Sequence, residues 1–378
     1  MKKLVLPVLL AAGALMASVP SAQAAAKQYV VVVSEGTSPQ VLDLGKGYLR
    51  KADEYPELTT QFDQLIEGGK AASAKSSVIS DLSGILETAE QNGYKTGFVT
   101  TTDVTKVAPL FYANLASALA KGDFIAGGGR TSTATAGAAL KAAGGTYITN
   151  SDELAEEIKG RVLAVEADGD LSYAIDRKPE DEASLAELAT LAIDTLGDND
   201  TPFVLVVHDT LIKKALETKD SPALFEQFRE VDGILGDALS RQEDNANFGV
   251  AAILTGGAIT PQFRAGADAN NSYFVLSSLQ KSFSGVGSAL KGADVDSITE
   301  FADPEQGEYR GWKLSAAQKQ QIAAGTLNAE TVARGAYEPV IKLDYAAAAT
   351  SPVAYTIGID GSAGVAEGIK AAVSKPAK

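Results

Sequence analysis

Histidine and cysteine, the side chains that most often ligate transition metals or act with a nucleophile, are nearly absent from this sequence. Its 378 residues contain one histidine, His208, and no cysteine. A single imidazole excludes a multi-histidine zinc centre within one chain, and the lack of thiols excludes thiolate metal sites, a cysteine nucleophile and disulfides. A Ser-His-Asp triad needs only one histidine, but no Gly-x-Ser-x-Gly motif is present.

The position of His208 is more informative than its rarity. It follows the apolar run Phe203–Val207 and is followed directly by Asp209. The carboxyl ends of strands in open parallel sheets are where ligands tend to bind. A lone histidine there is also compatible with a hydrogen-bonded core residue, because most buried polar groups are simply satisfied. The pattern alone leaves both interpretations open.

Two short stretches resemble ligand-binding loops but lack the partners that such loops need. Asp168-Gly169-Asp170 is not followed by further oxygen ligands at EF-hand spacing, so we interpret it as a turn. Gly127-Gly128-Gly129 is not followed by Gly-Lys-Ser/Thr and is therefore no phosphate-binding P-loop. Three glycines instead predict a tight turn at a strand end.

The amino terminus has the pattern of a secretory signal peptide over residues 1–24. Lys2 and Lys3 form the basic end, Leu4–Ala17 is apolar, and Ala22-Gln23-Ala24 is a small-residue cleavage site. The apolar run is shorter than the roughly 20 residues that a spanning helix needs, and no later apolar stretch is long enough. We expect a chain cleaved after Ala24, located in the periplasm or outside the cell, with no membrane span.

The chain is acidic, with a formal net charge of −15 that becomes −17 once Lys2 and Lys3 are removed. Binding to nucleic acid or anionic membranes requires clustered lysine and arginine. Nucleic acid is therefore an unfavourable partner. An unknown protein or a small anionic ligand remains as the expected partner.

Short apolar runs alternate with amphipathic segments along most of the chain. Residues 184–196 begin with a Ser-x-x-Glu capping box and stop at Gly197, and residues 224–239 repeat apolar side chains every three or four positions. This alternation predicts an α/β fold with a mostly parallel central sheet and helices on both faces. The expected strands are 29–33, 97–100, 124–126, 162–165, 203–207 and 250–254.

We expect one domain over residues 25–378, because no Pro/Ser-rich linker and no internal repeat divides the chain. Residues 257–335 have less regular patterning and are expected to form an insertion or a reduced cap.

Several strings, in the right order, resemble the alkaline phosphatase family. They span most of residues 29–358, and each is weak alone whereas six in order are fairly specific. The strings are Tyr94–Thr102 with Val104-Thr105 and Ala108-Pro109, Asp123–Arg130, Ala167–Tyr173 with Asp176-Arg177, Phe203–His208 with Val231-Asp232, Leu254–Gly257, and Gln280–Phe283. The resemblance implies an alkaline-phosphatase-like sheet, two zinc ions and one magnesium ion, and a metal-activated serine that attacks phosphate monoesters.

The residues that the resemblance would make metal ligands are largely replaced. Glu35 stands where the family has an aspartate that bridges metals, and Lys106 and Ala108 stand at magnesium-ligand positions. An ammonium group cannot ligate a cation while it keeps its proton.

The segment after the fifth strand departs from the family in the same way. His208-Asp209 replaces Glu-Gly, Lys213 replaces an aspartate, and Glu217 replaces a histidine four residues further on. These residues, with Glu35 and Lys106, form the expected vestigial pocket.

Other catalytic parts of the family pattern are missing. Leu254 runs directly into Thr255 without the expected Ala-Asp-His-Glu, and residues 347–353 lack the expected histidine. Between Asn114 and Asp123 there is no loop with the phosphate-binding arginine. Ser73, Ser76 or Ser77 could correspond to the nucleophile, but none follows an aspartate. No catalytic or metal-binding residue is therefore assigned.

These replacements favour a specific electrostatic hypothesis. Carboxylates that lose their cations would repel one another in a low-dielectric pocket, so Lys106 or Lys213 is expected to pair with Glu35 or Glu217. The competing interpretation is that both lysines point to solvent.

Two functions remain open at this point. The first is an exported, catalytically inactive alkaline-phosphatase-like protein with a binding or structural role and no cofactor. The alternative is a divergent metal-dependent phosphoric-ester hydrolase. It would hold magnesium or calcium through Glu35, Asp209 and a hydroxyl group near Thr102 or Ser76.

Overall fold

The computed structural model describes residues 27–53, 59–75, 77–155, 158–302, 313–347 and 351–377. The expected signal peptide, residues 1–24, and Ser76 lie outside these residues.

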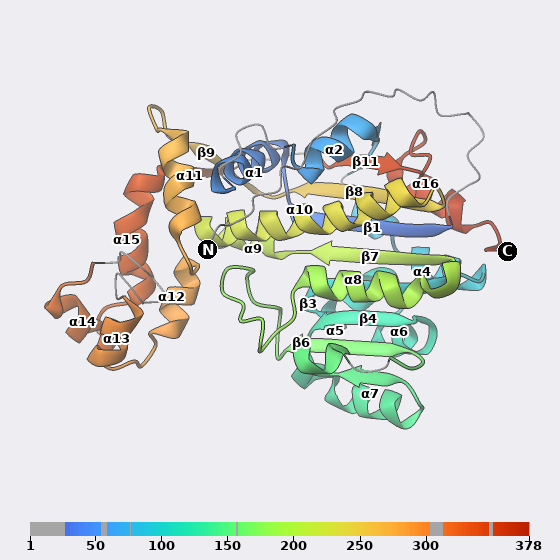
Figure 1. Ribbon diagram of the computed structural model, residues 1–378, viewed down its shortest axis with the longest axis horizontal. Coiled ribbons are helices and arrows are strands. Elements are labelled where there is room, and N and C mark those ends of the chain that lie inside the picture. The colour runs from blue at the N-terminus through green and yellow to red at the C-terminus, as the bar shows by residue number, and fades with distance from the viewer. Residues whose placement is uncertain are drawn as a thin grey trace, which may run out of the picture.

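A nine-stranded sheet runs through the centre of the described chain, in the order β2-β11-β8-β1-β7-β3-β4-β6-β5 (Figure 1). All pairings from β8 to β5 are parallel, and β11 runs antiparallel to both β8 and β2. The strands are β1 (Gln28–Gly36), β2 (Lys70–Ala72), β3 (Lys95–Asp103), β4 (Phe124–Gly128), β5 (Thr146–Ile148), β6 (Val162–Ala167), β7 (Phe203–Asp209), β8 (Phe248–Gly256) and β11 (Val353–Ile357). The predicted mostly parallel sheet and its six expected strands are confirmed.

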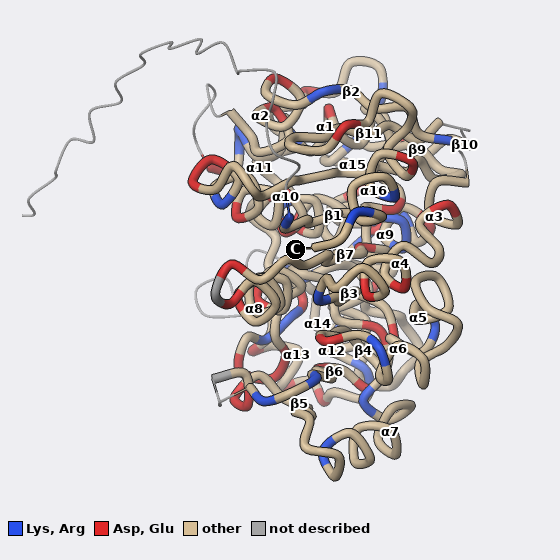
Figure 2. The backbone as a smooth tube through the Cα atoms, turned by 90° about the vertical axis from the view of Figure 1, so that its right-hand side faces the viewer, with Lys and Arg blue, Asp and Glu red and all other residues tan. Residues whose placement is uncertain are grey.

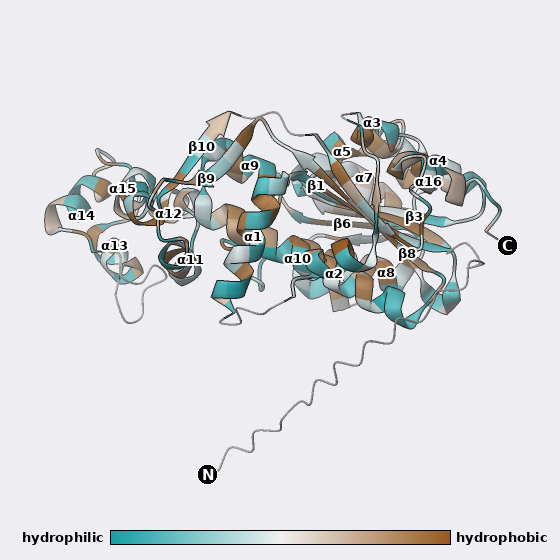
Figure 3. Ribbon diagram, turned by 90° about the horizontal axis from the view of Figure 1, so that it is seen from above, coloured by the Kyte–Doolittle hydropathy of each residue, from teal (hydrophilic) through white to brown (hydrophobic). Residues whose placement is uncertain are grey.

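Each face of the sheet carries its own core because successive strand residues point to opposite faces. In β1, Val30 and Val32 pack into one apolar cluster, whereas Tyr29, Val31 and Val33 pack into the other. Figure 3 shows these strands as the most hydrophobic part of the molecule. Burial of apolar surface, worth about 25 cal/mol per Å², supplies the stability that disulfides cannot provide here.

Helices cover both faces, as the alternating sequence pattern predicts. The first face is covered by α1 (Pro39–Ala52), α2 (Gln61–Gly68), α8 (Leu185–Leu196), α9 (Leu211–Thr218) and α10 (Ser221–Asp244). The second is covered by α3 (Val78–Asp81), α4 (Ile85–Gln91), α5 (Val104–Phe111), α6 (Leu115–Lys121) and α16 (Val365–Val373), while α7 (Arg130–Ala142) packs against β5 and β6. The predicted capping box of α8, Ser184 with Glu187, is present, and the helix ends at Gly197.

The described residues of 257–302 and 313–347 form a cap of short, regular elements beyond the carboxyl ends of β7 and β8 (Figure 1). These residues include most of the segment 257–335, for which a less regular insertion or cap was expected. Side-chain caps from Asp268, Ser282, Asp294, Ser315 and Asn328 begin five helices. The cap contains β9 (Ile259–Phe263), α11 (Ala269–Ser278), α12 (Phe283–Ala289), α13 (Val295–Phe301), α14 (Ala316–Ala323), α15 (Ala329–Ile341) and β10 (Leu343–Ala347).

In the backbone view of Figure 2, Lys/Arg and Asp/Glu positions are interspersed along the described part of the chain. Among the described residues, no helix combines the length and the apolar composition needed to cross a membrane.

Candidate functional site

The carboxyl ends of β1, β3 and β7 meet at the centre of the sheet and bring several of the expected site residues together. In the parallel register, Val33 of β1 lies opposite His208 of β7, and Thr100 of β3 lies opposite the same histidine. Glu35, two residues beyond Val33, therefore projects to the same face as His208. The strand that carries His208, β7, is the central strand of the nine-stranded sheet.

A three-residue cluster of Glu35, His208 and Lys213 occupies this strand end. Glu35 Oε1 lies 2.8 Å from His208 Nε2, and Glu35 Oε2 lies 2.9 Å from Lys213 Nζ. Burial raises the pKa of Glu35, but the hydrogen bonds and charges of His208 and Lys213 outweigh it and lower the pKa to about 2. Glu35 is thus held as a carboxylate, with one partner on each oxygen.

Gly36 allows helix α9 to approach β1 closely enough for this pairing. Its φ is +93°, and a Cβ at this position would lie 2.7 Å from the backbone of Lys213. Only glycine fits both the conformation and the contact. The turn after Glu35 therefore fixes where Lys213 lies.

His208 also contacts Thr100, which extends the cluster into a carboxylate-imidazole-hydroxyl chain. Thr100 Oγ1 lies 3.3 Å from His208 Nδ1 and accepts a hydrogen bond from the Thr102 backbone N–H at 3.1 Å. A neutral imidazole that donates from Nε2 to Glu35 accepts at Nδ1 from Thr100, whereas a protonated imidazole donates to both residues. This order resembles a hydrolase triad. However, Thr100 is 0% and His208 1% exposed, so no substrate reaches the hydroxyl in this conformation.

Asp209 lies on the opposite face of the sheet from Glu35 and His208, because adjacent residues in a strand alternate. Its carboxylate accepts hydrogen bonds from the backbone N–H groups of Leu211 and Ile212 and from Gln227. Burial raises the pKa of Asp209 to about 7. The expected oxygen-ligand set is therefore not assembled: Glu35 and Asp209 do not converge.

Lys106 forms a different ion pair from the one expected. Its ammonium group lies 3.2 Å from Asp170 Oδ1, and Lys214 lies 3.6 Å from Asp170 Oδ2. The expectation that Lys106 or Lys213 pairs with Glu35 or Glu217 is met by Lys213 with Glu35, whereas Lys106 pairs with Asp170 instead. Lys106 belongs to α5, after β3, which places it beside the turn at Asp170 instead of beside β1.

Glu217 is exposed on α9, one helical turn beyond Lys213. It acts on Lys213 through its charge, since both Glu35 and Glu217 raise the pKa of that lysine. The structure thus assembles Glu35, His208 and Lys213, and leaves Lys106, Asp209 and Glu217 in separate surroundings.

The metals that the family resemblance implies do not fit these residues. Within the described part of the chain, no three or more His, Cys, Asp or Glu side chains gather as ligands for a metal ion. Both oxygens of Glu35 are already engaged, one of them by an ammonium group. A protonated lysine next to the would-be ligand repels a cation.

Several residues near this site were not singled out from the sequence. Asp170 was interpreted only as part of a turn, which it is, yet it pairs with two lysines. Thr210 bonds the hydroxyls of Thr101 and Thr102 at 3.2 and 2.7 Å. The signal that could have found them is their shared position directly after a parallel strand.

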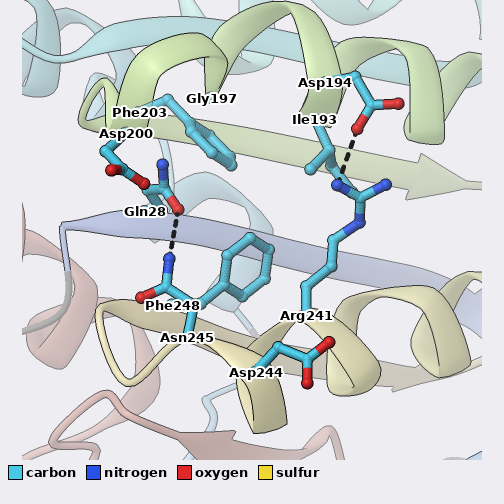
Figure 4. A pocket seen from close by; sticks show the side chains of 10 residues that line it. All are labelled: Gln28, Ile193, Asp194, Gly197, Asp200, Phe203, Arg241, Asp244, Asn245 and Phe248. Carbon is cyan, nitrogen blue, oxygen red and sulfur yellow. Dashed lines mark hydrogen bonds and ion pairs between the residues drawn. The ribbon is translucent and has the colours of Figure 1, made fainter.

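A cavity of about 320 Å³ lies at the opposite end of the sheet, where β1, β7 and β8 begin (Figure 4). Asn245 donates to Gln28 at 3.1 Å, and Arg241 pairs with Asp194 at 2.8 Å. These groups are already satisfied by one another, and they lie far along the strands from Glu35 and His208.

Comparisons with known proteins find similarity to alkaline phosphatases in sequence and in fold. The alkaline phosphatase family model matches residues 120–248. Alkaline phosphatase 4 of Bacillus subtilis is 26% identical over a match that covers 39% of this chain and 37% of that protein. The chain thus matches well under two thirds of the length of this curated relative.

Two solved structures share the fold over nearly the whole chain. The cold-active alkaline phosphatase of a psychrophilic Shewanella species superposes with a TM-score of 0.68 at 17% identity, covering 92% of this chain and 98% of that one. The Thermus thermophilus alkaline phosphatase gives a TM-score of 0.70 at 17% identity, with 87% and 85% coverage. Residues 120–248 thus resemble the alkaline phosphatase family in sequence, and the chain as a whole shares the fold of these two alkaline phosphatases.

Proposed function

We propose that this protein is an exported, catalytically inactive member of the alkaline phosphatase superfamily with a binding or structural role. The observation that carries the proposal is the Lys213–Glu35 ion pair at 2.9 Å. By motif spacing, Glu35 stands where the family has its metal-bridging aspartate, and Lys213 where it has another carboxylate. The ammonium group of Lys213 therefore supplies, next to Glu35, the positive charge that a bound metal ion would supply.

The burial of the Thr100 hydroxyl, which contacts His208, supports the same proposal. A nucleophile must reach its substrate, and the hydroxyl of Thr100 in the Glu35–His208–Thr100 chain is completely buried. Export is part of the proposal and is supported by the basic, apolar and small-residue pattern of residues 1–24.

Turnover of p-nitrophenyl phosphate tests the proposal. The mature chain is assayed with zinc and magnesium added, and again with EDTA, beside Bacillus subtilis alkaline phosphatase 4 as a positive control. We expect no turnover that depends on added metal. Turnover that EDTA abolishes and metal restores would contradict inactivity.

A pair of variants connects any measured activity to this site. Glu35→Gln changes the central carboxylate, whereas Glu367→Gln changes an exposed carboxylate that pairs with Lys75 elsewhere. If background turnover is unrelated to the site, both variants keep it unchanged. Selective loss in Glu35→Gln would reassign Glu35 as a working ligand.

A further inference from the structure

The cavity of about 320 Å³ at the amino ends of β1, β7 and β8 lies at the carboxyl ends of two helices (Figure 4). Gly197, the C-cap residue of α8, and Asn245, the C-cap residue of α10, both line it. The last carbonyl groups of a helix lack partners within the helix and carry the negative end of its dipole. Lys95 donates to one of them, that of Thr195, at 3.4 Å, but does not line the cavity. Two such helix ends favour a positively charged occupant.

The charged side chains that line this cavity are mostly acidic. Among the described residues of the lining, Asp194, Asp200 and Asp244 carry carboxylates and Arg241 carries the one positive charge, which gives a net charge of −2. Arg241 is shared between two carboxylates, Asp194 at 2.8 Å and Asp237 at 3.1 Å. The arginine therefore does not neutralise the lining.

Asp200 and Asp244 differ from the other polar residues of the lining in having no protein partner. Gln28 and Asn245 hydrogen-bond to each other, and Asp194 pairs with Arg241. In the part of the chain that the structure describes, the carboxylates of Asp200 and Asp244 form neither an ion pair nor a hydrogen bond. Both residues are exposed, so a ligand in the cavity reaches them.

The carboxylates of the lining are spread out, with aromatic rings between them. Figure 4 shows Asp200 at one end, Asp194 and Asp244 at the other, and the rings of Phe203 and Phe248 in the middle. The two rings meet edge to face, with their centroids 6.0 Å apart. Methylene groups pack well on such rings, and an ammonium group is attracted to a ring face. This arrangement suits an elongated cation with a carbon chain.

A metal ion does not suit the same arrangement. Calcium takes roughly six to eight oxygen ligands around one point. Over the residues that the structure describes, His, Cys, Asp and Glu side chains form no group of three or more that could hold a metal ion. The negative charges therefore match several separated positive charges better than one compact ion.

We propose that this cavity binds a linear organic cation with two or more ammonium groups, namely a diamine or polyamine. One ammonium group would lie at Asp200 and another at Asp194 and Asp244, with the methylene chain against Phe203 and Phe248. The chain's net charge of −15 raises the local concentration of such cations. The cavity lies at the opposite end of the sheet from the vestigial pocket, so the inference goes beyond the proposed function and stands without it.

Isothermal titration of the full chain with spermidine, putrescine and calcium chloride tests the site, with butanediol as the neutral analogue of putrescine. The buffer has an ionic strength of about 20 mM, because screening is weak there. We expect spermidine to bind, and putrescine to bind about tenfold more weakly because it is shorter and carries one charge fewer. Butanediol should not bind, and calcium should bind more weakly than spermidine by about tenfold or more.

Neutral substitutions locate the ligand. Asp200→Asn and Asp244→Asn each remove one charge and keep the shape of the side chain, and asparagine tolerates the left-handed backbone of residue 200, where φ is +57°. Each should weaken spermidine binding by about fivefold, and the double variant by about twentyfold. Glu243→Gln is the matched control, because Glu243 is exposed beside Asp244 on α10 but does not line the cavity. Its affinity should stay within about twofold of wild type.

A charge reversal separates binding from folding. Asp244→Lys places an ammonium group in the cavity, so spermidine binding should fall by about tenfold or more. A lysine at the carboxyl end of α10 interacts favourably with the helix dipole, so the melting temperature should not fall. Unchanged spermidine binding in this variant would contradict the proposed site.

Absence of spermidine binding, calcium binding as tight as that of spermidine, equal loss in Glu243→Gln and Asp244→Asn, or full binding by the double variant would each overturn the site. Butanediol binding as tight as that of putrescine would also overturn it, because the ligand would then be selected without its charge. Failure of the proposed function appears instead as EDTA-sensitive turnover, which these titrations do not measure.

Discussion

Replacing Lys213 by methionine keeps an unbranched side chain only one atom shorter and removes its charge, so it isolates the ion pair with Glu35. The lysine side chain is 46% exposed, whereas that of Glu35 is 16% exposed. The variant leaves a largely buried carboxylate with His208 as its remaining partner. The free energy of unfolding at pH 7 should therefore fall.

The magnitude follows from the pKa of Glu35. A shift from 4.5 to about 2 corresponds to roughly 3 kcal/mol, shared between His208 and Lys213. Solvent screens the half-exposed ammonium group, so its own share is about 1 kcal/mol. Because the pKa is lowered, this stabilisation is present above about pH 4.5 and is lost as the pH falls toward 2.

Urea unfolding followed by circular dichroism at pH 7 and pH 3 measures the effect. Lys75→Met is the matched control, because Lys75 pairs with Glu367 on the surface at 3.2 Å with both side chains well exposed. We expect Lys213→Met to be less stable than the wild type at pH 7, by an amount that shrinks at pH 3, and the control to be unchanged. A Lys213→Met protein as stable as wild type at pH 7, or equally destabilised at both pH values, would refute the reasoning.

Three other predictions concern neighbouring groups. Asp209 holds its proton in the folded state up to about pH 7, so wild-type stability should decline as the pH rises from about 4 to 8. Asp209→Asn should flatten that decline in urea curves at pH 5 and pH 8, and an unchanged slope would argue against a neutral Asp209. Asp220→Ala leaves the donors at the start of α12 unpaired and should lower the unfolding free energy by about 2–4 kcal/mol; a change within error would mean that the cap is fastened elsewhere. The double variant Lys213→Asp, Glu217→His places an aspartate next to Glu35 and a histidine one helical turn further along α9, and should gain zinc binding that titration calorimetry detects. Absence of binding in this variant would show that Lys213 does not lie at a metal position.

The buried strands could be predicted from the sequence because they are short apolar runs bounded by Gly, Asp or Pro. β2, β5 and β11 were not predicted, since they are short edge or near-edge strands whose pairing depends on distant partners. Residues 70–72 pair with 354–356, which no local pattern encodes. The cap helices were missed for a related reason: most are only seven to ten residues long, and their capping residues are more informative than their periodicity.

The sequence could predict only the part of the site whose positions follow from the pairing of neighbouring strands. Glu35 and His208 meet because β1 and β7 are adjacent and parallel, and Gly36 brings Lys213 to them. Motif spacing assigned Asp209 and His208 to the same pocket. In the structure they point to opposite faces of the sheet, because adjacent side chains alternate along a strand. The partner of Lys106 depends on how α5 and the turn at Asp170 pack, which sequence spacing does not determine.

The metal content of the full-length protein tests the central claim most directly, namely that an internal ion pair takes the place of bound cations. The full chain is produced, purified without chelators, dialysed, and measured by inductively coupled plasma mass spectrometry. We predict less than about one tenth of a zinc or magnesium ion per chain, because tight binding requires a set of converging deprotonated ligands. Zinc retained through dialysis at one ion or more per chain would contradict the claim.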